Sequence, residues 1–213
     1  MITGLILTLG GAVTGGLIAR ATEALAEPKP SPPLKRRLWL PIAGALLGLG
    51  ACVWGAWQDH TLLTMAFTAL FLWQLLLIAC VDAENHWLPD ILTFPLGITG
   101  LIASLLLPLP FGQGWLASVL AAAFGFGALW LVSFVYRKTR GQSGLGGGDP
   151  ILFGMGAAWV GFSDLMPVLF LASLLAALIA VGLKLRGHTV GRFSKLPFGT
   201  YLAVGFAIMW LIA

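Results

Sequence analysis

The chain has 213 residues, of which 59% are hydrophobic and only 9% are charged, and its mean hydropathy is +0.95. Soluble domains carry roughly a quarter charged residues, so this composition excludes a soluble globule with a polar surface. A net charge of +4 would suggest nucleic acid in a soluble protein, but here the basic residues are better explained as flanks of membrane spans. We therefore expect an all-α polytopic membrane protein, with one domain over residues 1–213, a lipid bilayer around it and no nucleic-acid partner.

Hydrophobic stretches of about the length that crosses a bilayer recur along the whole chain. The apolar region 151–183 is too long for one span and is interrupted near GFSDLMP (161–167), so we expect two spans there, the first of them short. We favour a total of about eight transmembrane helices with short loops, seven being the alternative. The remaining spans are expected over residues 2–19, 38–57, 62–81, 91–108, 115–136 and 197–213.

The twelve Lys and Arg residues are confined to the end of the first span and to three linkers. The first linker contains the basic, Pro-rich segment AEPKPSPPLKRR (26–37), which is expected to be an extended connector near the lipid headgroups. With eight spans, all three linkers fall on one side of the membrane, which the positive-inside rule makes cytoplasmic. The opposite side receives Asp59, His60 and Asp164 and no basic residue, and both termini are expected outside the cytoplasm.

Two of the eight carboxylates lie at the edge of an apolar stretch on the predicted cytoplasmic side. Asp82 ends one such stretch and Asp149 begins another, 67 residues later. An ionisable group at the membrane boundary is costly, which makes it a functional candidate. Asp149, followed by Pro150, could instead be a helix N-cap, and Asp90 after Pro89 could be one too. Asp82 has no such explanation, because a carboxylate at a helix C-terminus opposes the helix dipole.

If Asp82 and Asp149 meet, they have the chemistry of an aspartic protease. Two adjacent carboxylates cannot both ionise cheaply, so one keeps its proton while the other stays charged. The charged one can deprotonate a water, and the protonated one can polarise a carbonyl and protonate the leaving nitrogen. This mechanism needs neither a metal nor a cofactor, and we expect none. The two cysteines, Cys52 and Cys80, lie in apolar stretches and give no sign of a zinc site.

Three segments resemble motifs of the type IV prepilin peptidases, relatives of the preflagellin peptidases in the GxGD group of intramembrane aspartic proteases. VDAENHWLPD (81–90) is similar to the first aspartate motif, and GLGGGDP (144–150) is similar to the Gly-x-Gly-Asp motif. KLPFGTYLAVG (195–205) resembles the Pro-Phe-Gly-x-Tyr-Leu segment that opens the last span of the family. The likeness runs from about residue 62 to the C-terminus.

The resemblance implies that Asp82 and Asp149 are the catalytic pair. Asp90, which ends the first motif, is expected to support the site, as are Gly146 and Gly148 of the second motif. Glu84 stands where the family often has Asp, and it is also a supporting residue. Pro197, Phe198 and Gly199 match a segment to which no chemistry is assigned. Which aspartate acts as acid and which as base is open at this stage, because coupled groups titrate as a pair.

The implied activity is removal of short, basic leader peptides from type IV pilin-like or pseudopilin precursors at the cytoplasmic face of a bacterial inner membrane. Bacterial members commonly carry a larger loop after the first span with two CxxC pairs, with which N-methylation of the new N-terminus is associated. Here the loop is the linker 26–37, so the resemblance implies the peptidase activity but gives no basis for expecting the methyltransferase activity. It specifies neither the pilus or secretion system served nor an oligomeric state.

Two other hypotheses remain. The same acids could relay protons or bind a cation in a small transporter, although they cluster on one face and the chain shows no repeated halves. Alternatively, the protease fold could be retained without activity, because Pro150 and Ile151 depart from the family pattern after the second aspartate. His86 and Trp87 could contact substrate or simply be interfacial residues.

Overall fold

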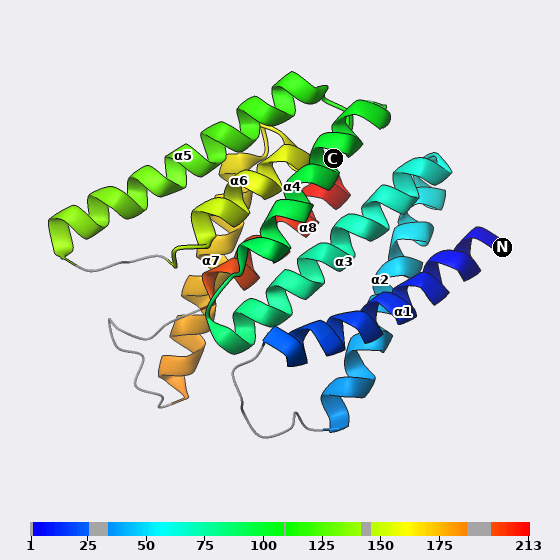
Figure 1. Ribbon diagram of the computed structural model, residues 1–213, viewed down its shortest axis with the longest axis horizontal. Helices are drawn as coiled ribbons and strands as arrows, with labels where there is room; N and C mark the ends of the chain where they lie inside the picture. The colour runs from blue at the N-terminus through cyan, green and yellow to red at the C-terminus, as the bar shows by residue number, and fades with distance from the viewer. Residues whose placement is uncertain (1, 26–33, 109, 142–145, 187–196) are drawn as a thin grey trace.

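The computed structural model describes the backbone of residues 2–25, 34–108, 110–141, 146–186 and 197–213. Within these ranges the regular structure is all α-helical, as predicted (Figure 1). Most of the linker 26–37, together with Arg192 and Lys195, falls outside the described residues. The eight helices are α1 (Ile2–Leu25), α2 (Leu34–Trp57), α3 (Leu62–Asn85), α4 (Asp90–Leu106), α5 (Trp115–Arg140), α6 (Asp149–Val160), α7 (Leu165–Leu185) and α8 (Phe198–Ile212).

Two helices extend further than their apolar stretches predicted. Helix α3 continues four residues beyond the predicted end at residue 81, so Asp82 and Glu84 lie in its last turn rather than after it. Helix α5 continues to Arg140, and Arg137 and Lys138 also lie in its last turn. Basic side chains favour the C-terminal end of a helix because the helix dipole is negative there.

The predicted break in the apolar region 151–183 is confirmed. Helix α6 ends at Val160, its C-cap Gly161 has a φ of 78° that favours glycine, and α7 begins at Leu165. At 1.5 Å per residue, the twelve residues of α6 extend only about 18 Å, which is well short of a bilayer core of about 30 Å. Among the described residues, four helices are long and apolar enough to cross a membrane, namely α2, α3, α5 and α7. Shorter apolar segments lie in α1, α4 and α8.

Aromatic side chains hold four of the helices together. Trp159 of α6 stacks on Phe71 of α3 with ring centroids 4.4 Å apart, and its indole N–H donates to the carbonyl of Leu96 in α4 at 2.7 Å. Trp210 of α8 packs edge-on against Trp159 and donates its N–H to the hydroxyl of Thr68 in α3 at 2.9 Å. These contacts are buried, and they fix the relative positions of α3, α4, α6 and α8.

Helices α1 and α2 form a closely packed pair beside this core (Figure 1). A Cβ placed at Gly11 would collide with the carbonyl oxygen of Gly44, and one at Gly44 would collide with that of Gly11. Small residues therefore allow the two backbones to touch, as in helix pairs inside membranes.

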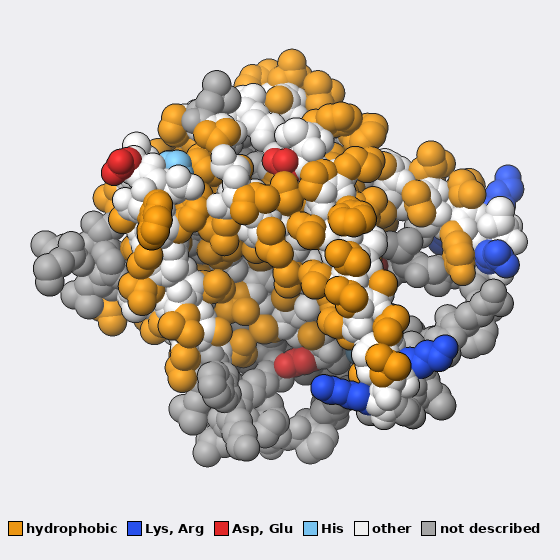
Figure 2. Space-filling model, turned by 180° about the vertical axis from the view of Figure 1, so that it is seen from behind, with side chains coloured by type: hydrophobic (Ala, Val, Ile, Leu, Met, Phe, Trp, Pro, Cys, Tyr) orange, Lys and Arg blue, Asp and Glu red, His pale blue; other side chains and the backbone are white. Residues whose placement is uncertain are grey.

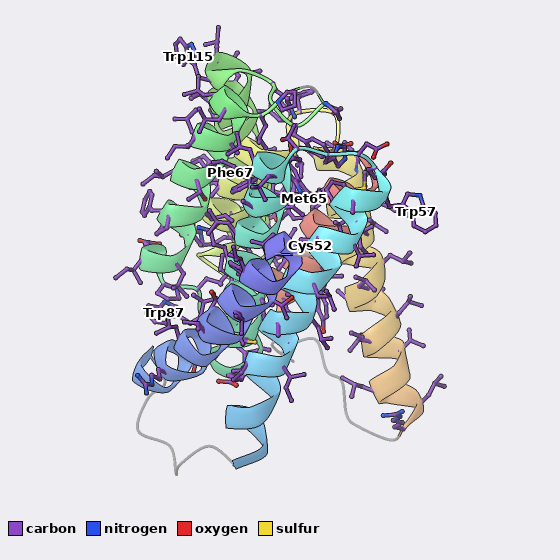
Figure 3. The ribbon with its side chains drawn as sticks, turned by 90° about the vertical axis from the view of Figure 1, so that its right-hand side faces the viewer. Cys52, Trp57, Met65, Phe67, Trp87 and Trp115 are labelled. Atoms are coloured by element: carbon purple, nitrogen blue, oxygen red, sulfur yellow. The ribbon has the colours of Figure 1, made fainter. Side chains whose placement is uncertain are left out.

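The surface has the distribution expected of a multi-pass membrane protein. Many large hydrophobic side chains are exposed, and on the face shown in Figure 2 they form a broad orange surface with charged side chains mainly towards its margins. Trp57 and Trp115 are 87% and 57% exposed, and both point outward in Figure 3, as interfacial tryptophans do. Trp54 of α2, in contrast, is partly buried and donates its indole N–H to the carbonyl of Leu211 in α8 at 2.8 Å.

Candidate active site

Four helix ends meet at one end of the molecule. Consecutive helices alternate in direction, so the last turn of α3 lies beside the first turns of α4, α6 and α8 (Figure 1). This is also the end at which α5 and α7 finish, with basic residues in their last turns. The two predicted catalytic aspartates lie at this end, on α3 and α6.

Asp82 is buried, with 4% of its surface exposed. Its Oδ2 atom accepts a hydrogen bond from the backbone N–H of Thr200 at 2.8 Å and a second from the Thr200 hydroxyl at 3.2 Å. The backbone N–H of Gly199 also interacts with this carboxylate. Gly199 and Thr200 are the second and third residues of α8, so the carboxylate lies directly against the first turn of that helix.

This arrangement offsets the cost of placing an acid at the C-terminal end of α3. The first turn of α8 has free backbone N–H groups and a positive dipole end, and it carries no acidic residue of its own. Asp82 supplies the missing acceptor from another helix. The segment beginning at Pro197 therefore has a specific role in this structure, which is to bring N–H donors to Asp82.

Asp149 is equally buried, with 4% of its surface exposed. It was considered as a helix N-cap, but the N-cap of α6 is Gly148 and Asp149 is the first helical residue. Its Oδ2 atom accepts the backbone N–H of Gly146 at 2.9 Å, and its own N–H donates back to the Gly146 carbonyl at 3.3 Å. The glycine segment, residues 146–148, thus folds back on Asp149 and orients its side chain.

Asp82 and Asp149 lie at the same end of the helix bundle. They are near enough for their charges to interact. Leu88, in the loop between α3 and α4, lies against the elements that carry both acids. A Cβ placed at Gly148 would lie 2.7 Å from Leu88 Cβ, and one placed at Gly199 would lie 2.6 Å from Leu88 Cδ1 and 3.0 Å from Asp82 Oδ2. Glycine at 148 and 199 is therefore required for the close approach of these segments.

The other residues of the first predicted motif lie at the end of α3, in the following loop and at the start of α4. Asp90 is exposed and is the first residue of α4, so it is not the N-cap, which is Pro89. Glu84 is partly buried in the last turn of α3. Trp87 is 57% exposed, and His86 has a left-handed backbone with a φ of 52°, which is uncommon for a residue other than glycine.

Sequence reasoning missed two residues of the site, Thr200 and Leu88. Thr200 lies inside the segment 195–205, which resembles a motif of the family. The feature that could have indicated its role is that the first turn of this apolar helix contains no acidic residue of its own. Leu88 looks like any apolar loop residue in the sequence, and only the packing of three segments shows what it does.

A hollow in the described part of the chain lies away from the two aspartates. It has a volume of about 240 Å³ and is lined by the C-terminal ends of α6 and α8, including Trp159, Val160 and Trp210, with Asp164 at its edge. Asp149 lies at the opposite, N-terminal end of α6, and Asp82 of α3 lies against the N-terminal end of α8. Among the described residues, no three His, Cys, Asp or Glu side chains are grouped as metal ligands.

Comparison with known proteins identifies the family to which the chain is similar. The pattern of the type IV leader peptidase family matches residues 69–181, a range that contains both Asp82 and Asp149. No solved structure matches the chain significantly.

Several curated relatives share this similarity, each named prepilin leader peptidase/N-methyltransferase. The protein from Pseudomonas aeruginosa is 34% identical over 186 residues, which is 83% of this chain and 59% of the relative. Those from Dichelobacter nodosus and Neisseria gonorrhoeae are each 34% identical and cover 70% and 76% of this chain. The chain spans about half to three-fifths of the length of these relatives. With the family pattern matched over more than half of its length, the chain belongs to the type IV leader peptidase family.

Proposed function

We propose that this chain is a membrane-embedded aspartic endopeptidase that removes short, basic leader peptides from type IV prepilin or pseudopilin-like precursors. The observation that carries this proposal is the pairing of two buried carboxylates, Asp82 and Asp149, at one end of the helix bundle. The family assignment supports the class of reaction, and the names of the relatives support the class of substrate. The proposal covers the peptidase step and does not extend to N-methylation.

The proposed chemistry needs one proton on the pair. One carboxylate takes a proton from a water molecule, and the water oxygen forms a bond to the scissile carbonyl carbon. The protonated carboxyl donates a hydrogen bond to the carbonyl oxygen, which stabilises the charge that develops there. Breakdown of the tetrahedral intermediate breaks the C–N bond, and the leaving nitrogen receives a proton from the pair. Atoms and charges balance, and no covalent enzyme intermediate forms.

The glycine segment fits the approach of an extended peptide. Gly146 and Gly147 are exposed next to Asp149, and they have no side chains to obstruct a backbone. A peptide that runs past this segment would present its carbonyl to the pair, and the apolar helix of the precursor would remain in the bilayer. Irregular backbone at membrane depth is tolerated where it lines a polar site of this kind.

The charge distribution supports a cytoplasmic position for the site in a bacterial inner membrane. Arg137, Lys138, Arg140 and Lys184 lie in the last turns of α5 and α7, at the same end as the aspartates. The described loops at the other end contain Asp59 and Asp164 and no Lys or Arg. Under the positive-inside rule, the end with the aspartates faces the cytoplasm. Both acids lie at this end and not at mid-membrane, which favours a peptidase over a proton or cation carrier.

The proposal is tested by co-expressing the chain with a pilin-like precursor and following leader removal on a gel. Cleavage by the wild-type chain and its loss in Asp82→Asn and in Asp149→Asn are expected, with both variants still inserted in the membrane. Full cleavage by either variant would contradict the two-aspartate mechanism. Asp90→Asn is the matched control, because Asp90 is an exposed acid in the same region.

A further inference from the structure

Thr200 makes a set of contacts that the catalytic proposal does not yet use. Its backbone N–H and its hydroxyl both reach Asp82 Oδ2, at 2.8 and 3.2 Å. The same hydroxyl lies 3.1 Å from the backbone carbonyl of Ala79, one turn earlier on α3. A single side chain at the start of α8 thus spans the last turns of α3.

The two donors of Thr200 differ in what they can do. The backbone N–H of Thr200 is held in place by α8, so it points at Asp82 Oδ2 whether or not that carboxyl group is charged. The hydroxyl carries one proton and has two acceptors in reach, so it can donate to Asp82 or to the Ala79 carbonyl. It donates to Asp82 when that group carries a charge, because hydrogen bonds to a charged acceptor are the stronger ones.

The donors around the two aspartates are unequal. Each acid lies at the N-terminal end of a helix, Asp82 against α8 and Asp149 in the first turn of α6, so the helix dipoles do not distinguish them. Asp82 receives two donors from Thr200, whereas Asp149 accepts one N–H from Gly146. Donors favour the charged form of a carboxylate over the neutral form. When the two carboxyl groups share one proton, the negative charge therefore lies mainly on Asp82, which has more hydrogen-bond donors than Asp149.

We propose that Thr200 is a positioning residue that holds Asp82 as the ionised member of the pair. Asp82 is then the base that takes the proton from water, and Asp149 is the acid that polarises the scissile carbonyl. This assignment rests on the proposed peptidase function.

The test uses Thr200→Val, which removes the hydroxyl and keeps the size, and Thr200→Ser, which keeps the hydroxyl. Thr68→Val is the matched control, because Thr68 is a buried threonine whose hydroxyl also joins α3 to α8, through Trp210. The full chains are reconstituted in lipid, and kcat and KM are measured for cleavage of a pilin-like precursor. A hydrogen bond to a charged group corresponds to roughly a ten- to hundredfold change in rate.

We expect Thr200→Val to lower kcat by about ten- to hundredfold with little change in KM, and Thr200→Ser to restore most of the rate. Thr68→Val should reduce thermal stability but leave kcat near that of the wild type. Wild-type kcat in Thr200→Val would overturn the proposal. An equal loss of kcat in Thr68→Val would also overturn it, because the effect would then reflect only the packing of α3 on α8.

A second measurement does not depend on activity. The shift in unfolding midpoint caused by Thr200→Val is compared in the wild-type chain and in Asp82→Asn. We expect a clearly larger shift when residue 82 can carry a charge, since contacting residues show such non-additivity. Equal shifts would overturn the proposal. A wild-type chain that cleaves no precursor would refute the proposed function, while this comparison would still decide whether Thr200 holds the charge on Asp82.

Discussion

Replacing Gly148 with alanine tests whether the close packing of the glycine segment on Leu88 positions the catalytic pair. Gly148 has φ −82° and ψ −19°, which alanine adopts freely, so any effect comes from space and not from the backbone conformation. The added Cβ would lie 2.7 Å from Leu88 Cβ and 3.1 Å from the Leu88 carbonyl oxygen. Neither atom belongs to a flexible side-chain end that can move aside.

The size of the effect follows from the distance. Carbon atoms pack best at about 3.5 Å or more, so α6 and the Leu88 loop must separate by roughly 0.8 Å. Overpacking of this kind costs about 1–3 kcal/mol of stability. Asp149 follows Gly148 directly and would move with it, and a displacement of about 1 Å in a catalytic group can cost roughly a hundredfold in rate.

The assay compares Gly148→Ala with Gly147→Ala. A Cβ at Gly147 has no other atom within 4 Å, so this neighbouring substitution introduces the same methyl group without a collision. We expect a loss of about a hundredfold in the precursor cleavage rate for Gly148→Ala and nearly wild-type cleavage for Gly147→Ala. Equal rates in the two variants would refute the argument that contact with Leu88 sets the position of Asp149.

Three further substitutions test other parts of the account. Asp90→Asn should retain substantial cleavage in the gel assay, because Asp90 is exposed at the start of α4; a loss as complete as in Asp82→Asn would mean that the wrong acids were paired. Gly44→Ala should lower the unfolding midpoint, at a cost of about 1–3 kcal/mol, whereas Gly50→Ala on the same helix meets nothing within 4 Å and should be neutral or slightly stabilising. Trp159→Phe removes the buried donor to Leu96 and should cost about 1–3 kcal/mol in thermal unfolding; an unchanged midpoint would contradict the importance of that bond.

The helical architecture, and the placement of Asp82 and Asp149 at one end of it, were predictable from local patterns in the sequence. Apolar runs can be read from neighbouring residues, and they predicted where the helices lie. The segregation of Lys and Arg predicted which end of the helices carries Asp82 and Asp149. Helix ends were less predictable. Helices α3 and α5 both continue past their predicted apolar spans, to Asn85 and Arg140, because a helix continues for as long as its backbone hydrogen bonds are satisfied.

The details of the site depended on contacts between distant segments. Thr200 contacts Asp82 across 118 positions of the chain, and no local pattern specifies that pairing. Asp149 was weighed as a helix cap because Asp before Pro favours that position, but its carboxylate turns back to Gly146. The unfavourable position of Asp82 at a helix C-terminus was the one sequence feature that indicated a partner, and the first turn of α8 is that partner.

The central claim is that Asp82 and Asp149 together hydrolyse the leader peptide of a pilin-like precursor. The most direct measurement uses the purified full chain in lipid vesicles with such a precursor and follows both products by mass spectrometry. We predict one cut between the basic leader and the apolar segment by the wild-type chain, and no product above background with Asp82→Asn or Asp149→Asn. Cleavage at the wild-type rate by either variant, or no cleavage by a correctly folded wild-type chain, would contradict the account.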